Sequence, residues 1–150
     1  MKIMLDTMIY DKLVADSGNL QLLLKAIGEG KLALLATHIQ RDQLSDISVL
    51  EKRAQVLTIP TTSVPTSGAV FDLSKWDEAT WGDAESDQAI ECLGIGNPKH
   101  APDALIAATA AGLVDWLVTE DRPLTNRVRR AGLPVEVTDY EGLVALISRI

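Results

Sequence analysis

Acidic side chains stand where predicted strands end and where predicted helices begin. In an open α/β sheet, the carboxyl ends of the strands and the amino ends of the following helices share one edge, and ligands bind there. We therefore expect the acids at these positions to lie close together. They are Asp6, Asp42, Asp103, Glu120 and Asp121.

Carboxylates that converge on one edge repel each other and lose hydration, so cations or protons must compensate. Without histidine or cysteine at metal-ligand spacing, carboxylates are hard oxygen ligands that favour Mg²⁺ or Mn²⁺ over zinc. Such ions activate water and stabilise displacement at phosphorus, which predicts a metal-dependent phosphodiesterase site. Each acid taken alone has a simpler interpretation, because Asp and Glu also cap helices and favour helix amino ends.

Strands and helices alternate along the chain at lengths typical of a parallel sheet covered on both faces. The pattern predicts an α/β fold with three layers, α/β/α, around a short and mostly parallel central sheet. The predicted strands are Lys2–Leu5, Leu32–Ala36, Trp116–Thr119 and Pro134–Val137. The predicted helices are Thr7–Ala15, a helix from Leu20 that stops at Gly28, a helix from Thr37 through Leu50, Asp103–Ala111 closed by Gly112, Asp121–Ala131 followed by Gly132, and Tyr140–Ser148 capped by Asp139.

The segment between residues 58 and 94 interrupts this alternation. It begins rich in Thr, Ser and Pro and continues into Ala69–Leu73, whose alternation predicts an edge hairpin insertion near 60–82. A helix is predicted from about Asp83 to Gly94. Residues 72–91 hold seven acids against one lysine, whereas four of the seven arginines lie between 122 and 130. The net charge of −7 is therefore unevenly distributed.

Length and composition favour one globular domain spanning residues 1–150. Hydrophobic residues at 47% and charged residues at 23% exclude a disordered or collagen-like chain. Cys92 is the only cysteine, which excludes an internal disulfide and a zinc ribbon. The single cysteine favours the reducing cytoplasm, so we expect a cytoplasmic protein. No apolar run approaches the roughly 18 residues of a membrane span, so we also expect it to be soluble.

Four segments of the chain resemble the motifs of PIN-domain nucleases, in the family's order. They are Met4–Thr7, Thr37–Leu44, Asp103–Ala110 and Leu117–Asp121. Many members of this family are toxin ribonucleases of the VapC type. The resemblance implies a PIN-like fold and a metal-dependent endoribonuclease, the toxin of a toxin–antitoxin pair, with RNA as substrate.

The resemblance also assigns roles to individual residues. Asp6, Asp103 and Asp121 match acidic positions that hold Mg²⁺ or Mn²⁺, and Thr119 matches a small hydroxyl residue that often precedes the last acid. Glu120 is expected to complete the site or to position water. A small antitoxin that covers the site and a homodimer are the protein partners that we expect.

The second motif departs from the family pattern. Members usually carry Glu before the leucine that is here Leu44, whereas this chain has Gln43 there and Asp42 one place earlier. Neighbouring positions on a helix differ by about 100° in direction, so both side chains cannot face one ion equally well. Either Asp42 takes the acidic role, which is our prediction, or Gln43 supplies a neutral oxygen.

Two further sets of residues bear on the substrate. Arg122 and Arg127 lie on the helix that begins after Asp121, so they are the predicted contacts to the RNA backbone. Trp76 and Trp81 stand among acids that repel phosphates, so we expect them to pack on the domain or to bind a basic partner rather than stack on bases.

Two other functions fit the same residues. A phosphatase or phosphoacceptor could use the same acidic edge, although no Asp-x-Asp pair follows the first strand. A catalytically degenerate PIN domain could act as an interaction module for protein or RNA, and Gln43 in the second motif is the main support for that alternative.

Overall fold

The computed structural model describes residues 1–67, 77–80, 93 and 101–150. Several predictions from the sequence lie outside this part of the chain. They are the alternating stretch Ala69–Leu73, the helix from Asp83 to Gly94 apart from Leu93, and the positions of Trp76 and Trp81.

The described elements alternate between strands and helices, as the sequence predicts. The strands are β1 (Lys2–Leu5), β2 (Ala33–Ala36), β3 (Thr62–Ser63), β4 (Thr66–Ser67), β5 (Ala79–Thr80), β6 (Trp116–Val118) and β7 (Glu136–Thr138). The helices are α1 (Thr7–Ala15), α2 (Ser17–Gly28), α3 (His38–Ser45), α4 (Leu50–Leu57), α6 (Ala101–Leu113), α7 (Arg122–Ala131) and α8 (Tyr140–Ile147).

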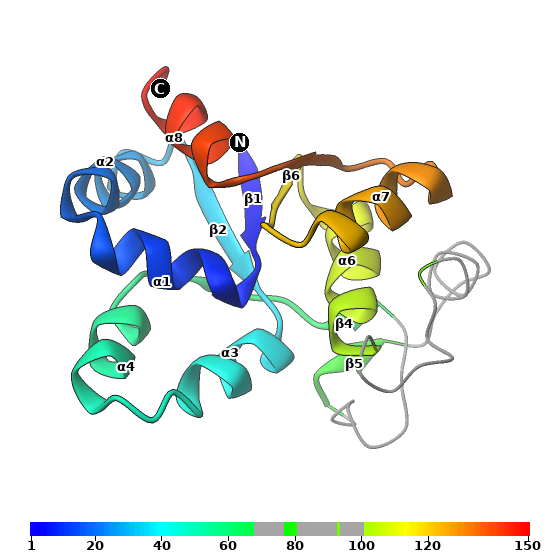
Figure 1. Cartoon of the computed structure of the whole chain (residues 1–150), viewed down its shortest axis with the longest axis horizontal. Coiled ribbons are helices and arrows are strands. Elements are labelled where there is room, and N and C mark those ends of the chain that lie inside the picture. The colour runs from blue at the N-terminus through cyan, green and yellow to red at the C-terminus, as the bar shows by residue number, and fades with distance from the viewer. Residues whose placement is uncertain (68–76, 81–92, 94–100) are drawn as a thin grey trace.

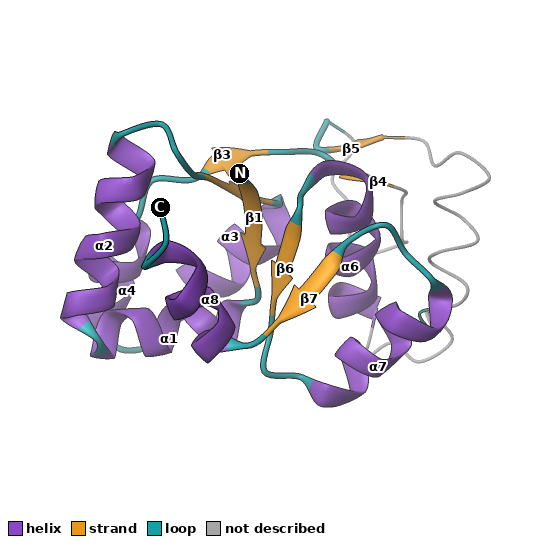
Figure 2. Cartoon of the chain, turned by 90° about the horizontal axis from the view of Figure 1, so that it is seen from above, coloured by secondary structure: helices purple, strands orange, loops and turns teal. Residues whose placement is uncertain are grey.

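The main sheet has five strands in the order β3-β2-β1-β6-β7, and every pair in it is parallel. Strand β1 is central, with Met4 opposite Leu35 on β2 and Leu117 on β6. Helices cover both faces of the sheet (Figures 1 and 2). The predicted three-layer α/β/α fold is therefore confirmed.

Strand β1 contributes to two hydrophobic clusters because its side chains alternate between the faces of the sheet. Ile3 and Leu5 pack with the apolar sides of α1, α2 and α8. Met4 packs on the opposite face with α6 and α7, through residues such as Leu105 and Leu124. All of these side chains are buried, so the position of β1 is set from both faces.

The sequence predicts an edge hairpin near 60–82. The described residues of this segment form no hairpin. Strand β3 joins the edge of the main sheet beside β2, and β4 pairs with β5 as a separate two-stranded sheet. The β4–β5 pair is parallel, which excludes the tight turn that joins a hairpin. Strand β4 is held instead by α6, where the Thr109 hydroxyl accepts a hydrogen bond from Ser67 N at 3.0 Å.

The helix boundaries differ from the prediction most clearly after β2 and at the end of α6. The helix after β2 ends at Ser45, and a second helix begins at Leu50, so the continuous helix predicted from Thr37 is two helices. Helix α6 continues through Gly112 to Leu113, so Gly112 does not close it. By contrast, Gly132 follows α7 with a φ of 64°, the left-handed conformation that favours glycine after a helix.

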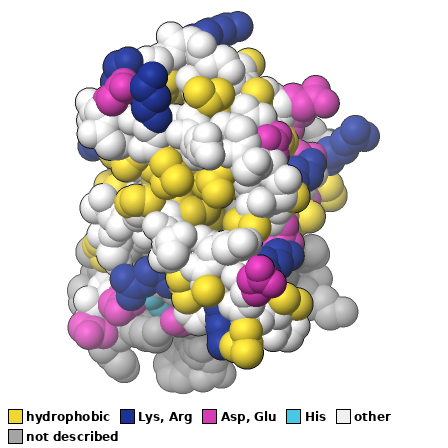
Figure 3. Space-filling model, turned by 90° about the vertical axis from the view of Figure 1, so that its left-hand side faces the viewer, with side chains coloured by type: hydrophobic (Ala, Val, Ile, Leu, Met, Phe, Trp, Pro, Cys, Tyr) yellow, Lys and Arg dark blue, Asp and Glu magenta, His cyan; other side chains and the backbone are white. Residues whose placement is uncertain are grey.

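Hydrophobic side chains gather on the face of the molecule formed by α1, α2 and α4 (Figure 3). Exposed leucines of these helices include Leu22 on α2 and Leu50 and Leu57 on α4, with 69% of Leu50 accessible to solvent. No helix in the described part of the chain is long and apolar enough to cross a membrane.

We predict that Gly142→Ala destabilises the fold. Gly142 lies in the first turn of α8, where a Cβ atom would collide with the Thr138 side chain at the end of β7. Crowding of this kind costs about 1–3 kcal/mol of unfolding free energy, which urea denaturation measures.

Gly112→Ala is the matched control for this prediction. Gly112 lies within α6, and a Cβ atom added there would meet no atom of the described residues within 4 Å, so alanine should stabilise by about 0.4–1 kcal/mol. Equal effects of the two substitutions would contradict the packing argument.

Candidate acidic site at the carboxyl edge of the sheet

The order of the strands identifies one edge as the place for a ligand. From β1 the chain proceeds to β2 and β3 on one side, while β6 and β7 lie on the other. The connections therefore diverge between β1 and β6, and ligands of open α/β sheets bind at the carboxyl ends of the strands at such a point. Asp6 directly follows β1, and residues 119–121 directly follow β6.

Asp6 occupies the N-cap position of α1 but does not cap this helix. Its carboxylate makes no capping hydrogen bond. It instead accepts a hydrogen bond at Oδ2 from the Thr119 hydroxyl at 2.6 Å, and one at Oδ1 from the Thr7 hydroxyl at 3.3 Å. Only 8% of Asp6 is exposed. The simpler interpretation of Asp6, a helix cap, therefore does not apply.

Thr119 joins the two acids. Its buried hydroxyl donates to Asp6 and accepts a hydrogen bond from the backbone N–H of Asp121 at 3.0 Å. The backbone adds a second link between the strands, since Asp6 N donates to Val118 O at 2.8 Å. The two strand ends are thus fixed to each other at the residues that carry the acids.

Asp121 has a structural role through one oxygen. It is the N-cap of α7, and its Oδ1 accepts a hydrogen bond from Leu124 N at 2.9 Å. The second oxygen receives no hydrogen bond from the described residues. Asp121 can therefore cap its helix with one oxygen and offer the other to a ligand.

The two acids have no basic partner among the described residues. The ion pairs found there involve neither Asp6 nor Asp121. A buried carboxylate without a cation nearby is costly, and hydroxyl donors such as Thr119 and Thr7 compensate only in part. The oxygen-only donor set and the absence of a basic partner in this part of the chain fit a hard divalent cation.

Asp103 lies in the first turn of α6 and is partly exposed. Helix α6 precedes β6, and its first turn points toward the carboxyl edge of the sheet (Figure 1). In the described part of the chain, however, no group of three or more His, Cys, Asp or Glu side chains is arranged to hold a metal ion. The structure thus joins Asp6 to Asp121 through Thr119 and does not complete a cluster with Asp103.

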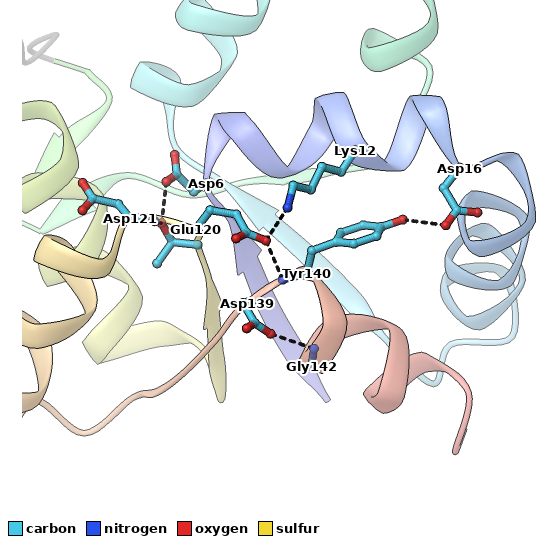
Figure 4. Close-up of polar contacts among 9 residues, drawn as sticks. Asp6, Lys12, Asp16, Glu120, Asp121, Asp139, Tyr140 and Gly142 are labelled. Atoms are coloured by element: carbon cyan, nitrogen blue, oxygen red, sulfur yellow. Dashed lines mark hydrogen bonds and ion pairs between the residues drawn. The ribbon is translucent and has the colours of Figure 1, made fainter.

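Glu120 faces α1 and α8. Its Oε1 is 2.7 Å from the Lys12 amine and accepts a hydrogen bond from Tyr140 N at 3.2 Å. Lys12 also lies over the Tyr140 ring, and the Tyr140 hydroxyl donates to Asp16 (Figure 4). These contacts link the loop after β6 to three helices, α1, α2 and α8. Glu120 therefore anchors the loop that carries Thr119 and Asp121.

The two candidates of the second motif are both exposed on α3. Asp42 and Gln43 lie on the part of the helix that solvent reaches, whereas Gln40, three residues before Gln43, is fully buried. At about 100° per residue, Asp42 lies about 200° around the helix from Gln40, and Gln43 lies on nearly the same side as Gln40. Asp42 thus lies on the side of α3 away from Gln40, and this position does not support the acidic role that we predicted for Asp42.

Gln40 is the residue that sequence reasoning missed. Its Oε1 accepts hydrogen bonds from the backbone N–H and the hydroxyl of Thr37, at 2.7 and 3.1 Å, and its Nε2 donates to Leu5 O at 2.6 Å. Thr and Gln three residues apart form a capping box, which is a sequence signal for the start of a helix. Nothing in that spacing indicates the contact with β1.

The two predicted RNA contacts differ in their surroundings. Arg122 is exposed in the first turn of α7. Arg127 is partly buried and donates from Nη1 to Leu93 O at 3.3 Å, while its Nε and Nη2 are buried and have no hydrogen-bond partner in the described part of the chain. Arg122 is therefore the more accessible cation next to the acidic edge.

Comparisons of the chain with protein-family models, with curated proteins and with solved structures find no match. The resemblance to PIN-domain nucleases therefore stays a hypothesis drawn from the four motifs. The function must be argued from the geometry of the site.

We predict that Thr119→Val lowers stability by about 1–3 kcal/mol. The substitution keeps the shape of the side chain but leaves the buried Asp6 carboxylate and the Asp121 N–H without their shared partner. Chemical denaturation at pH 7 measures the loss. Thr119→Ser keeps the hydroxyl and should lose less than about 1 kcal/mol, the value of a buried methyl group, so equal losses would contradict the role of the hydroxyl.

Glu120→Gln should weaken the fold at neutral pH and have less effect in acid. The Lys12 amine and the Tyr140 N–H hold the pKa of Glu120 below its usual 4.5. A lowered pKa in the folded state stabilises the fold above pH 4.5, and this contribution disappears as the pH falls through the folded-state pKa.

The stability of Glu120→Gln and of the parent should therefore differ by up to about 1 kcal/mol at pH 7 and converge below pH 4.5. Denaturation curves between pH 3 and 7 test this. Glu136→Gln, at an exposed acid of β7, is the control. A gap for Glu120→Gln that stays constant with pH would exclude the ion pair as its source.

Proposed function

We propose that this protein is a metal-dependent endoribonuclease with its active site around Asp6 and Asp121. One observation carries the proposal. The Asp6 carboxylate lies at the carboxyl edge of the sheet, is nearly buried, neither caps its helix nor pairs with a basic side chain of the described residues, and is tied to Asp121 through Thr119. A carboxylate that only stabilised the fold would be expected to serve as a cap or to form an ion pair.

The donor set suits Mg²⁺ or Mn²⁺. Magnesium is usually held by one or two carboxylates, with water and substrate phosphate supplying the other ligands. Asp6 and the second oxygen of Asp121 would hold the ion, and Asp103 is the predicted third ligand. A bound ion would lower the pKa of a coordinated water and offset charge that develops at phosphorus.

The protein's own groups have distinct tasks in this proposal. Thr119 orients Asp6, and Glu120 holds the loop through Lys12 and Tyr140. Helices α1 and α7 begin beside the acids, so the partial positive charges of their amino ends favour a phosphate at this edge. Arg122, exposed at the first position of α7, would draw in the RNA backbone.

The remaining parts of the proposal rest on the motif resemblance. They are RNA as the substrate, a role as the toxin of a toxin–antitoxin pair, an antitoxin partner, a homodimer, and a place in the cytoplasm. A second candidate is an interaction module without catalysis. Its support is the lack of a three-carboxylate group in the described part of the chain, together with the exposure of Asp42 and Gln43.

We predict that RNA cleavage needs Mg²⁺ or Mn²⁺ and is lost in excess chelator. Asp6→Asn, Asp103→Asn and Asp121→Asn should each reduce cleavage by more than the roughly 10–100-fold that loss of an outer-shell partner costs. Asparagine still caps α7, so the Asp121 substitution removes charge without removing the cap.

Asp139→Asn is the matched control. Asp139 caps α8 through Gly142 N, near the same edge, and should keep full activity after this substitution (Figure 4). Cleavage that persists in chelator, or that survives Asp6→Asn, would overturn the proposed mechanism. Metal binding without any RNA cleavage would favour the interaction module.

A further inference from the structure

The side chain of Gln40 lies where the β1–β2 ladder should continue. At the start of this ladder, Ala33 N donates to Met1 O at 2.9 Å. A parallel ladder repeats every two residues, so its continuation would bring Thr37 N to Leu5 O. Strand β2 ends at Ala36, one residue before that bond would form.

The carboxamide of Gln40 replaces this missing backbone bond. Thr37 N donates to Gln40 Oε1 at 2.7 Å, and Gln40 Nε2 donates to Leu5 O at 2.6 Å. The Thr37 hydroxyl donates to the same Oε1. The amide oxygen therefore faces Thr37, and the amide nitrogen faces Leu5 O. One side chain therefore satisfies two buried backbone groups and sets the spacing of the two strand ends.

The carbonyl that Gln40 holds belongs to the peptide bond between Leu5 and Asp6. The N–H of the same peptide donates to Val118 O on the other side, at 2.8 Å. Both polar groups of this peptide are thus fixed, one by Gln40 and one by β6. The plane of this peptide sets the bond from Asp6 N to Cα, and with the φ of −62° at Asp6 it sets the direction in which the side chain leaves the backbone.

We propose that Gln40 is a positioning residue for the divalent-cation site, acting through the Leu5–Asp6 peptide on the direction of the Asp6 carboxylate. The inference rests on the proposed function, because it takes Asp6 as a ligand of the ion. Gln40 itself touches neither the ion nor the RNA in this scheme. Its substitution should therefore change metal affinity rather than the rate at saturating metal.

The test measures Mn²⁺ binding by titration calorimetry on the full chain and three variants. Gln40→Glu keeps the acceptor for Thr37 and loses the donor to Leu5, and Gln40→Met loses both. Each should weaken Mn²⁺ binding by about 10–100-fold, the usual effect of losing an outer-shell partner. Thr37→Val is the matched control, because it removes the hydroxyl of the capping box and leaves the bond from Gln40 to Leu5.

Thr37→Val should lower the melting temperature while its Mn²⁺ affinity stays within about twofold of the parent. RNA cleavage by Gln40→Met, measured against Mn²⁺ concentration, should need more metal and approach the parent rate at saturation. Mn²⁺ affinity in Gln40→Glu that equals or exceeds that of the parent would overturn the positioning role. So would an equal loss of affinity in Thr37→Val, since any disturbance of α3 would then suffice.

The same experiment separates this inference from the proposed function. A parent protein that binds Mn²⁺ but does not cleave RNA would overturn the ribonuclease, while the affinities of the variants would still decide the role of Gln40. A parent protein that binds no Mn²⁺ would overturn both.

Discussion

The hydrogen bond from the Thr119 hydroxyl to the Asp6 carboxylate joins β1 and β6 beyond the end of their backbone ladder. It depends on the register of the two strands, in which Leu5 lies opposite Val118, so that the next residues of both strands meet. A shift of one residue would turn every side chain of β1 to the other face and remove Ile3 and Leu5 from their cluster. The packing of the core therefore fixes the geometry of the acidic edge.

Aspartates at similar places in the chain have different roles. Asp16 and Asp139 cap helices with their side chains, and Asp121 does so with one oxygen. Asp6 holds the same N-cap position before α1 and turns its carboxylate to the neighbouring strand instead. All four residues are aspartates at the N-cap position of a helix. Asp6 differs from them in being nearly buried and in having the Thr119 hydroxyl, directly after β6, as its hydrogen-bond donor.

Local patterns predicted most of the fold. The apolar run before Asp6 and the caps at Asp139 and Gly132 act within a few residues, and the elements that they define are found in the structure. The break between α3 and α4 was not predicted, since Ile47 and Leu50 continue the apolar spacing across it. The parallel pairing of β4 with β5 was also missed, because strands of two residues carry no alternation from which a direction can be inferred.

The geometry of the candidate site could be predicted only in part. The alternation of strands and helices indicated that Asp6 and Asp121 share an edge, and the motif resemblance added Thr119. Gln40 escaped because its contact with Leu5 spans 35 residues and belongs to no local pattern. The ion pair of Glu120 with Lys12 spans 108 residues and was hidden for the same reason.

The central place of β1 in the sheet also determines when the acidic edge can form during synthesis. Asp6 is made before its partner Thr119, which follows 113 residues later. While β6 remains within the ribosome, Asp6 has neither the hydroxyl nor the backbone carbonyl that holds it. Contacts of such long sequence separation form late in folding, because a large loop must close first. A nascent or truncated chain that lacks β6 would therefore have β1 and the helices near it without an assembled acidic pair. Whatever chemistry this edge performs would begin only after β6 and Thr119 have been synthesised.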